Sequence, residues 1–124
     1  MRQEYDFSML NGDFYRIIEQ EDLHFKVQVN ADHKIYQGHF PEYPITPGAC
    51  LLQMTQELLS IVKGRKMHLQ SVTNLKFVAV HTPDQPIMVD YKALGNEKYQ
   101  VTIYDSTTIY AKMSEQYLCA NTDV

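Results

Sequence analysis

One short stretch of the chain holds the residues whose types and spacing are suited to chemistry. His39 stands in a segment rich in glycine and proline, and Gly48 follows at the start of a long apolar run. A histidine with its ordinary pKa of about 6.5 can act as a general base at neutral pH. Free N–H groups at a helix start, here at Gly48 and Ala49, donate to a carbonyl oxygen that gains negative charge. Together these groups are the minimum for enolising a thioester, whereas alone His39 also fits an ordinary loop histidine bonded to backbone.

The positioning of these residues depends on a loop followed by a helix. Residues 36–48 carry too many glycines and prolines for a helix interior or a central strand, so we predict a loop. We expect Thr46 to be the N-cap and Pro47 the first residue of a helix that runs to Lys63, with Gly64 as its stop. Apolar residues cover most of this helix, which predicts burial. Its narrow polar stripe consists of Gln53, Gln56, Glu57 and Ser60.

The rest of the chain has the patterns of β-strands. Residues 23–30 alternate strictly between apolar and polar, and a polar turn at 20–22 separates them from a partner strand at 14–19. Further strands are predicted at 69–80, 87–94, 99–105 and 108–118. One buried helix with two strands before it and four after it indicates an α+β fold, an antiparallel sheet wrapped around one long central helix. We expect a single domain over residues 1–124, with residues 1–12 loosely ordered.

Composition narrows the possible partners and compartments. The 124 residues carry a net charge of −4, and the basic residues are scattered except at Lys63, Arg65 and Lys66, which disfavours nucleic acid. The sequence shows no secretory signal and no apolar span of membrane length, so we expect a cytoplasmic protein without a membrane segment. Cys50 and Cys119 are then expected to be free thiols. The histidines lack paired ligand spacing, so no metal is predicted.

The loop and the helix after it are similar to a known family. Gly38-His39-Phe40-Pro41, then Pro44, Pro47-Gly48 and the apolar helix, closely resemble the GHFPG-x-P-I-M-P-G loop of the FabZ and FabA type β-hydroxyacyl-[acyl-carrier-protein] dehydratases. The resemblance covers roughly residues 14–118. It implies the hot-dog fold, a homodimer or higher oligomer with active sites at the protomer boundary, and no cofactor. The implied reaction is water elimination from a β-hydroxyacyl thioester of acyl carrier protein or coenzyme A.

The resemblance also assigns roles to individual residues. It makes His39 the catalytic base and the Gly48 N–H the group that polarises the thioester carbonyl, and it places Phe40, Pro47 and Ala49 against the substrate. The family's second catalytic group is a Glu or Asp on the helix of the other protomer, but this chain has Gln53 at that position. An amide can orient the β-hydroxyl, yet it has no titratable proton to give.

Three further residues are weighed for a part in the chemistry, two as acids and one as a nucleophile. Glu57, one turn beyond Gln53, and Glu42, three residues from His39, are hypothetical substitutes for the carboxylate. A solvated polar stripe explains Glu57 as well. Cys50 lies in the first helical turn, where a thiol pKa can fall, so a nucleophilic role is conceivable beside its simpler role as a small buried residue.

Two rival functions remain open at this point. A hot-dog thioesterase would use the same helix start on the same carbonyl but deliver water to it. A non-catalytic homologue that binds an acyl chain or pairs with an active dehydratase subunit is favoured by Gln53. The acyl length and the pathway, whether fatty acid, lipid A, polyketide or pigment synthesis, stay undetermined.

Overall fold

The computed structural model describes residues 10–36 and 45–119, and this part of the chain contains one long helix and six strands. Helix α1 spans Gly48–Lys63, and a short 3-10 helix η2 spans Lys34–Tyr36. The strands are β1 (Tyr15–Glu21), β2 (His24–Val29), β3 (Met67–Phe77), β4 (Ile87–Gly95), β5 (Lys98–Tyr104) and β6 (Ile109–Cys119).

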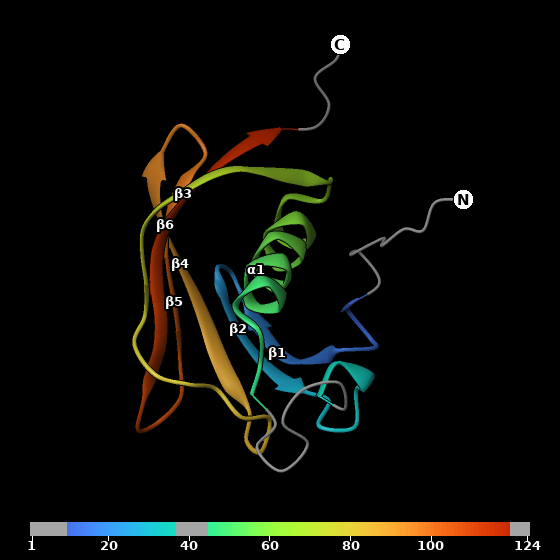
Figure 1. Ribbon diagram of the computed structural model, residues 1–124. Coiled ribbons are helices and arrows are strands. Elements are labelled where there is room, and N and C mark those ends of the chain that lie inside the picture. Colours follow the sequence, from blue (N-terminus) through green and yellow to red (C-terminus); the bar gives the residue numbers. More distant parts are fainter. Residues whose placement is uncertain (1–9, 37–44, 120–124) are drawn as a thin grey trace, which may run out of the picture.

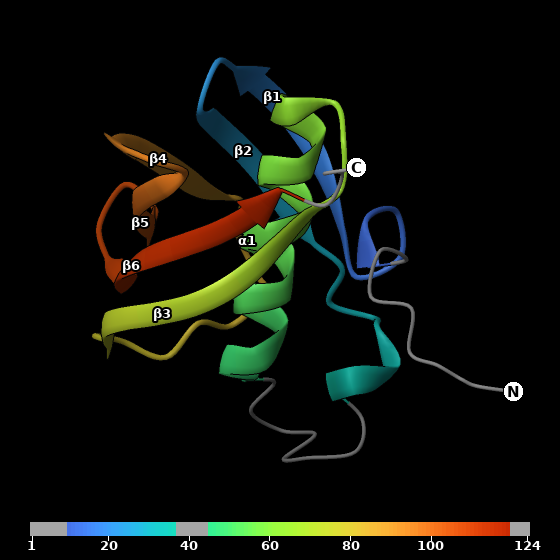
Figure 2. The ribbon, with the colours of Figure 1, turned by 90° about the horizontal axis from the view of Figure 1, so that it is seen from above.

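The six strands form one sheet in the order β1-β2-β4-β5-β6-β3, and every neighbouring pair is antiparallel. The sheet bends, and α1 lies in its hollow, as Figures 1 and 2 show from two directions. Strand β3 follows α1 in sequence but joins the sheet at its far edge, beside β6. This arrangement confirms the predicted α+β class and the sheet wrapped around one helix.

The core lies between the helix and the inner face of the sheet. On β2, every second residue is buried, as the strict alternation of the sequence predicted. The helix contributes a buried apolar face that contains Leu51, Met54, Leu58 and Leu59. Three of these four side chains have no exposed surface, which confirms a helix buried on its inner side.

The helix begins one residue later than predicted. Pro47 occupies the N-cap position with an extended backbone, and no side chain caps the helix. Thr46, the predicted cap, uses its hydroxyl in other hydrogen bonds, to Tyr36 and His81. The predicted stop is confirmed, because Gly64 takes the left-handed conformation with φ of 70°.

Strand boundaries and the N-terminal segment also differ from the sequence prediction. Strand β1 runs through the predicted polar turn to Glu21, and the chain reverses at Asp22, whose φ is 52°. Strand β3 begins at Met67 and ends at Phe77, ahead of the predicted end at Val80. Of the segment expected to be loosely ordered, residues 1–9 lie outside the described part, but Asn11 is fixed by a main-chain hydrogen bond to Glu57. In the described ranges, no helix is long and apolar enough to cross a membrane.

Candidate active site

The first turn of α1 presents the backbone groups predicted for carbonyl binding. The leading N–H groups of a helix have no acceptor within the helix, and here no side chain caps them. The ring of Phe77, at the end of β3, lies against Gly48. A Cβ on Gly48 would come within 2.6 Å of the Phe77 Cζ atom, so only glycine fits without displacing the ring. Phe77 is half exposed and was missed by the site prediction.

The predicted site residues divide between the described and the undescribed parts of the chain. His39, Phe40 and Glu42 lie outside the described residues. Gly48 and Ala49 stand in the first turn of α1, directly after Pro47; Pro47 is half-buried and Ala49 exposed. The described portion of the site is therefore the helix start and the polar stripe that follows it.

Gln53 and Glu57 contact each other on that stripe. The Gln53 Nε2 donates to Oε2 of Glu57 at 3.3 Å, and the Gln56 Nε2 donates to Oε1 of Gln53 at 3.4 Å. Both ends of the Gln53 amide are thus engaged by neighbours on its own helix, which orients the amide group.

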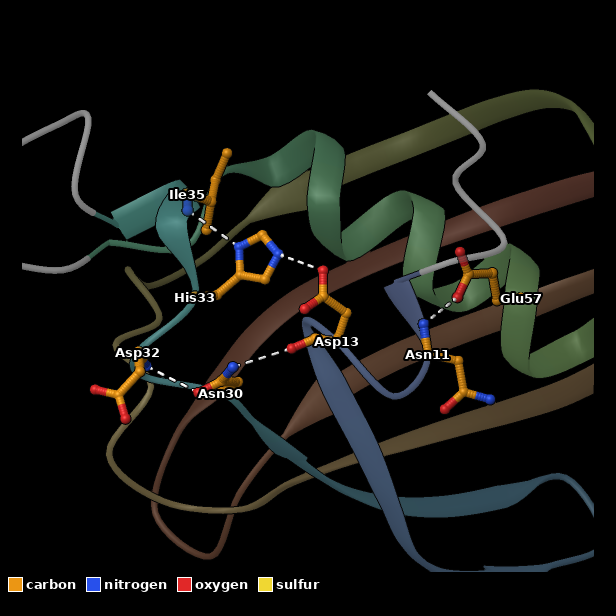
Figure 3. Close-up of polar contacts among 7 residues, drawn as sticks. All are labelled: Asn11, Asp13, Asn30, Asp32, His33, Ile35 and Glu57. Atoms are coloured by element: carbon orange, nitrogen blue, oxygen red, sulfur yellow. Dashed lines mark hydrogen bonds and ion pairs between the residues drawn. The ribbon is translucent and has the colours of Figure 1, made fainter. Parts of the chain in front are cut away.

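Glu57 is buried rather than solvated, which corrects the alternative that placed it on a solvated stripe. Its side chain is 8% exposed. The Tyr15 hydroxyl donates to Oε1 at 2.9 Å. The Asn11 N–H donates to the same oxygen at 3.1 Å, as Figure 3 shows. Burial raises the pKa of the Glu57 carboxyl, while hydrogen bonds from Tyr15, Gln53 and Asn11 partly oppose that rise.

Polar contacts also hold the segment that joins β2 to η2. Figure 3 shows His33 between two partners. The Ile35 N–H donates to His33 Nδ1 at 3.0 Å, so Nε2 carries the proton and donates to Asp13 Oδ2 at 3.2 Å. The Phe14 ring packs edge-on against His33 and stacks on Tyr36, with centroid distances of 5.4 and 6.2 Å. These contacts fix η2 on the body of the fold.

Tyr36, Thr46 and His81 form a buried cluster beside the helix start. The Thr46 Oγ1 lies 2.7 Å from the Tyr36 hydroxyl and 2.6 Å from Nδ1 of His81. Burial lowers the pKa of His81 to about 4, although Asp84 and Asp105 act in the opposite direction. His81 is therefore neutral at pH 7. No local pattern predicted this cluster, because its members are far apart in sequence.

Comparison with known proteins decides the family. A family model described as ApeI-like, ApeI dehydratase, matches residues 16–115. The chain belongs to the ApeI-like dehydratase family. This confirms the resemblance to FabZ-type dehydratases that the loop motif indicated.

Curated relatives of this ApeI-like chain include two enzymes named 3-hydroxyacyl-[acyl-carrier-protein] dehydratase FabZ. The Lactococcus lactis subsp. cremoris (strain MG1363) protein is 19% identical over 104 residues, which cover 78% of this chain and 72% of the relative. The Shewanella sp. (strain MR-4) protein is 21% identical over 117 residues, which cover 84% and 76% respectively. These relatives support a hydratase or dehydratase type of lyase.

Solved structures show the same fold at low identity. The dehydratase heterocomplex ApeI:P from Xenorhabdus doucetiae has a TM-score of 0.68 at 14% identity, covering 84% of this chain and 96% of that one. A hypothetical thioesterase with coenzyme A from Streptococcus pneumoniae TIGR4 has a TM-score of 0.62 at 14% identity, covering 96% and 98%. These likenesses confirm the predicted hot-dog fold.

A second buried carboxyl of this ApeI-like protein belongs to β6 and contacts the helix at Thr55. Glu115 on β6 has no exposed surface and accepts a hydrogen bond from Thr55 Oγ1 at 2.7 Å and another from the Tyr117 hydroxyl. Burial raises its pKa. Sequence reasoning missed Glu115 because it stands in a strand pattern, and it packs against α1 on the side away from Gln53 and Glu57.

Two other side-chain predictions can be compared with the geometry. Burial raises the pKa of the Cys50 thiol, whereas the nucleophile hypothesis needed a lowered one. That hypothesis is therefore wrong in its electrostatic premise. Among the residues that the structure describes, no group of three or more histidine, cysteine or acidic side chains is arranged to hold a metal ion.

Proposed function

We propose that this protein dehydrates a β-hydroxyacyl thioester carried by acyl carrier protein to the trans-2-enoyl thioester. The observation that carries the proposal is the uncapped start of α1 at Gly48 in a chain of the ApeI-like dehydratase family. A carbonyl oxygen that approaches this turn meets N–H donors and the positive end of the helix dipole. The pathway would be of the fatty acid, lipid A or polyketide type, and the substrate would place the protein in the cytoplasm.

In the proposed reaction, His39 removes a proton from the α-carbon of the substrate. The electron pair moves toward the carbonyl oxygen, where the Gly48 N–H stabilises the developing charge. The pair then returns to form the α,β double bond and expels the β-hydroxyl, which takes the proton from His39 and leaves as water. Phe40, Pro47 and Ala49 are assigned to substrate contact.

Gln53, supplied by the second protomer of a homodimer, would hold the β-hydroxyl in line for this proton transfer. The hydrogen bonds from Gln56 and to Glu57 support this assignment because they restrict the amide to one orientation. Glu57 then supports the site from behind Gln53, and Glu42 remains a second candidate carboxyl near His39. Loss of a general acid typically lowers a rate by about 10² to 10⁴, so we expect slow turnover.

The test is incubation of the purified protein with a β-hydroxyacyl thioester of acyl carrier protein, with detection of the α,β-unsaturated product. We expect turnover by the native protein, loss of turnover in His39→Ala and faster turnover in Gln53→Glu. Release of free thiol instead of the enoyl product would indicate a thioesterase and refute the proposal. A Glu57→Gln variant with an unchanged pH–rate profile would remove Glu57 from the mechanism.

A second candidate function is a non-catalytic acyl-binding or partner subunit of an active dehydratase. Gln53 is the observation that favours it, because the amide lacks the proton of the family's acid. Absence of turnover by the native protein, together with tight acyl binding and co-purification of a related chain that carries the missing carboxylate, would support this alternative.

A further inference from the structure

Two hydrogen bonds join Thr46 to His81. The Thr46 N–H donates to the His81 carbonyl oxygen at 2.9 Å, and the Thr46 Oγ1 bonds to His81 Nδ1 at 2.6 Å. A main-chain bond and a side-chain bond between the same two residues fix both the position and the rotation of Thr46. Only Pro47 separates Thr46 from Gly48, and its ring restricts φ, which is −64° here. The direction of the Gly48 N–H therefore follows from how Thr46 is held.

Tyr36, the last residue of η2, also contacts Thr46. Its hydroxyl lies 2.7 Å from the Thr46 Oγ1. In sequence, Tyr36 and Thr46 stand on either side of the segment that contains His39. The Tyr36–Thr46–His81 cluster thus joins Tyr36, before that segment, to Thr46, which comes just before Pro47 and the helix start.

His81 has a feature that packing alone does not explain. It is 2% exposed, its ring stands edge-on to Tyr110 at 5.1 Å, and its buried Nε2 has no hydrogen-bond partner in the described part of the chain. Buried polar atoms are nearly always paired, and an aliphatic side chain would fill this space without an unpaired nitrogen. The bond from Nδ1 to Thr46 gives a reason for a histidine at this position.

We propose that His81 is a positioning residue that acts through Thr46 to aim the Gly48 N–H at the thioester carbonyl. This inference rests on the proposed function, because the carbonyl is that of the proposed substrate. His81 itself does not touch the substrate. Its ring is neutral, so a side chain without charge that bonds to Thr46 from the same place can replace it.

The experiment compares variants that break the cluster with variants that keep it. His81→Leu and Thr46→Val remove the bond at nearly constant shape, whereas His81→Asn and Thr46→Ser retain a polar atom for it. We expect kcat for dehydration to fall about 10- to 100-fold in the first pair, with KM changed less than about threefold, because small misplacements of catalytic groups have effects of this size. The conservative pair should recover most of the kcat.

Tyr36→Phe removes one hydroxyl from the cluster and has a matched control. Tyr104→Phe removes a hydroxyl that bonds to Asp90 at 2.8 Å, away from the helix start. Both variants lose one tyrosine hydroxyl, so a fall in kcat for Tyr36→Phe alone supports the proposal. Equal kcat in His81→Leu, His81→Asn and the native protein, or equal falls in both tyrosine variants, would overturn it.

Amide hydrogen exchange provides a readout that does not need turnover. In His81→Leu and Thr46→Val, we expect faster exchange of the N–H groups at positions 46, 50 and 51, which donate to the His81 and Pro47 carbonyls in the native protein, while the amides of β4 and β5 keep their native rates. If the native protein fails to dehydrate, the proposed function is refuted, and exchange alone then judges the positioning role. Unchanged exchange at positions 46, 50 and 51 would overturn the inference even in an active enzyme.

Discussion

Two of the buried hydrogen-bond networks that hold α1 to the rest of the fold differ in the kind of titratable group they bury. The cluster at the helix start centres on His81, a base whose pKa burial lowers to about 4. The network about two and a half helical turns further along α1 centres on Glu57, an acid whose pKa burial raises. Burial favours the neutral form in both places. Acidification therefore lowers the contribution of the first network to the free energy of unfolding and raises that of the second. The two contributions should change with pH in opposite directions.

The largest effect is expected at Gly48, in the region of the first network. Gly48→Ala would push a methyl group against the Phe77 ring, so that either the ring or the helix start that carries the N–H donor must shift. Loss of one such donor typically lowers kcat by about 10² to 10³. Steady-state kinetics on the thioester would measure the change. The double variant Gly48→Ala, Phe77→Leu should recover part of the loss; no recovery would mean that the ring contact is not the cause.

The pH dependence of stability tests the His81 side of the comparison. The unfolded histidine binds a proton near pH 6.5 and the folded one near pH 4, so the unfolded state binds more protons between these values. Stability is fully present above about pH 6.5 and falls by about 3 kcal/mol as the pH drops to 4. Urea unfolding of the native protein and of His81→Asn across this range should show a shallower fall for the variant. Parallel curves would contradict the assignment.

Gln53→Glu tests the Glu57 side. The new carboxyl would stand where the Gln53 amide now donates to Glu57 at 3.3 Å, and two carboxylates so close cannot both ionise easily. We expect a loss of about 1 to 3 kcal/mol in the free energy of unfolding at pH 7, shrinking toward pH 5 as one carboxyl takes a proton. The matched control is the exchanged pair Gln53→Glu, Glu57→Gln, which keeps one acid and one amide and should regain stability.

The smallest effect is expected at Cys50, which lies between the two networks and belongs to neither. Because burial raises its thiol pKa, alkylation by iodoacetamide at pH 7.5 should be slower than for a model thiol. Cys50→Ala should leave kcat unchanged within error. A large loss of turnover in this variant, with normal folding, would restore the nucleophile hypothesis.

The fold could be predicted where patterns of neighbouring residues determine the structure. The two hydrogen-bond networks could not be predicted. The alternation of residues 23–30 and the apolar run ending at Gly64 gave β2 and α1 nearly as they are. Thr46 looked like a helix cap because its bond to His81, 35 positions away in sequence, has no local signature. Glu57 looked solvated for the same reason, since its partners Asn11 and Tyr15 come from more than 40 positions earlier. Contacts with residues distant in sequence determine the environment of both Thr46 and Glu57.

The contact from Asn11 to Glu57 is made by the main chain. Every residue type except proline supplies that donor, so position 11 can vary freely among homologues while the buried carboxylate keeps its partner. An alignment would show no conservation there, although the position matters. Substitution of Asn11 keeps its main-chain N–H, whereas truncation past residue 11 removes this donor to Glu57. Shortened forms of the protein should therefore begin before Leu10.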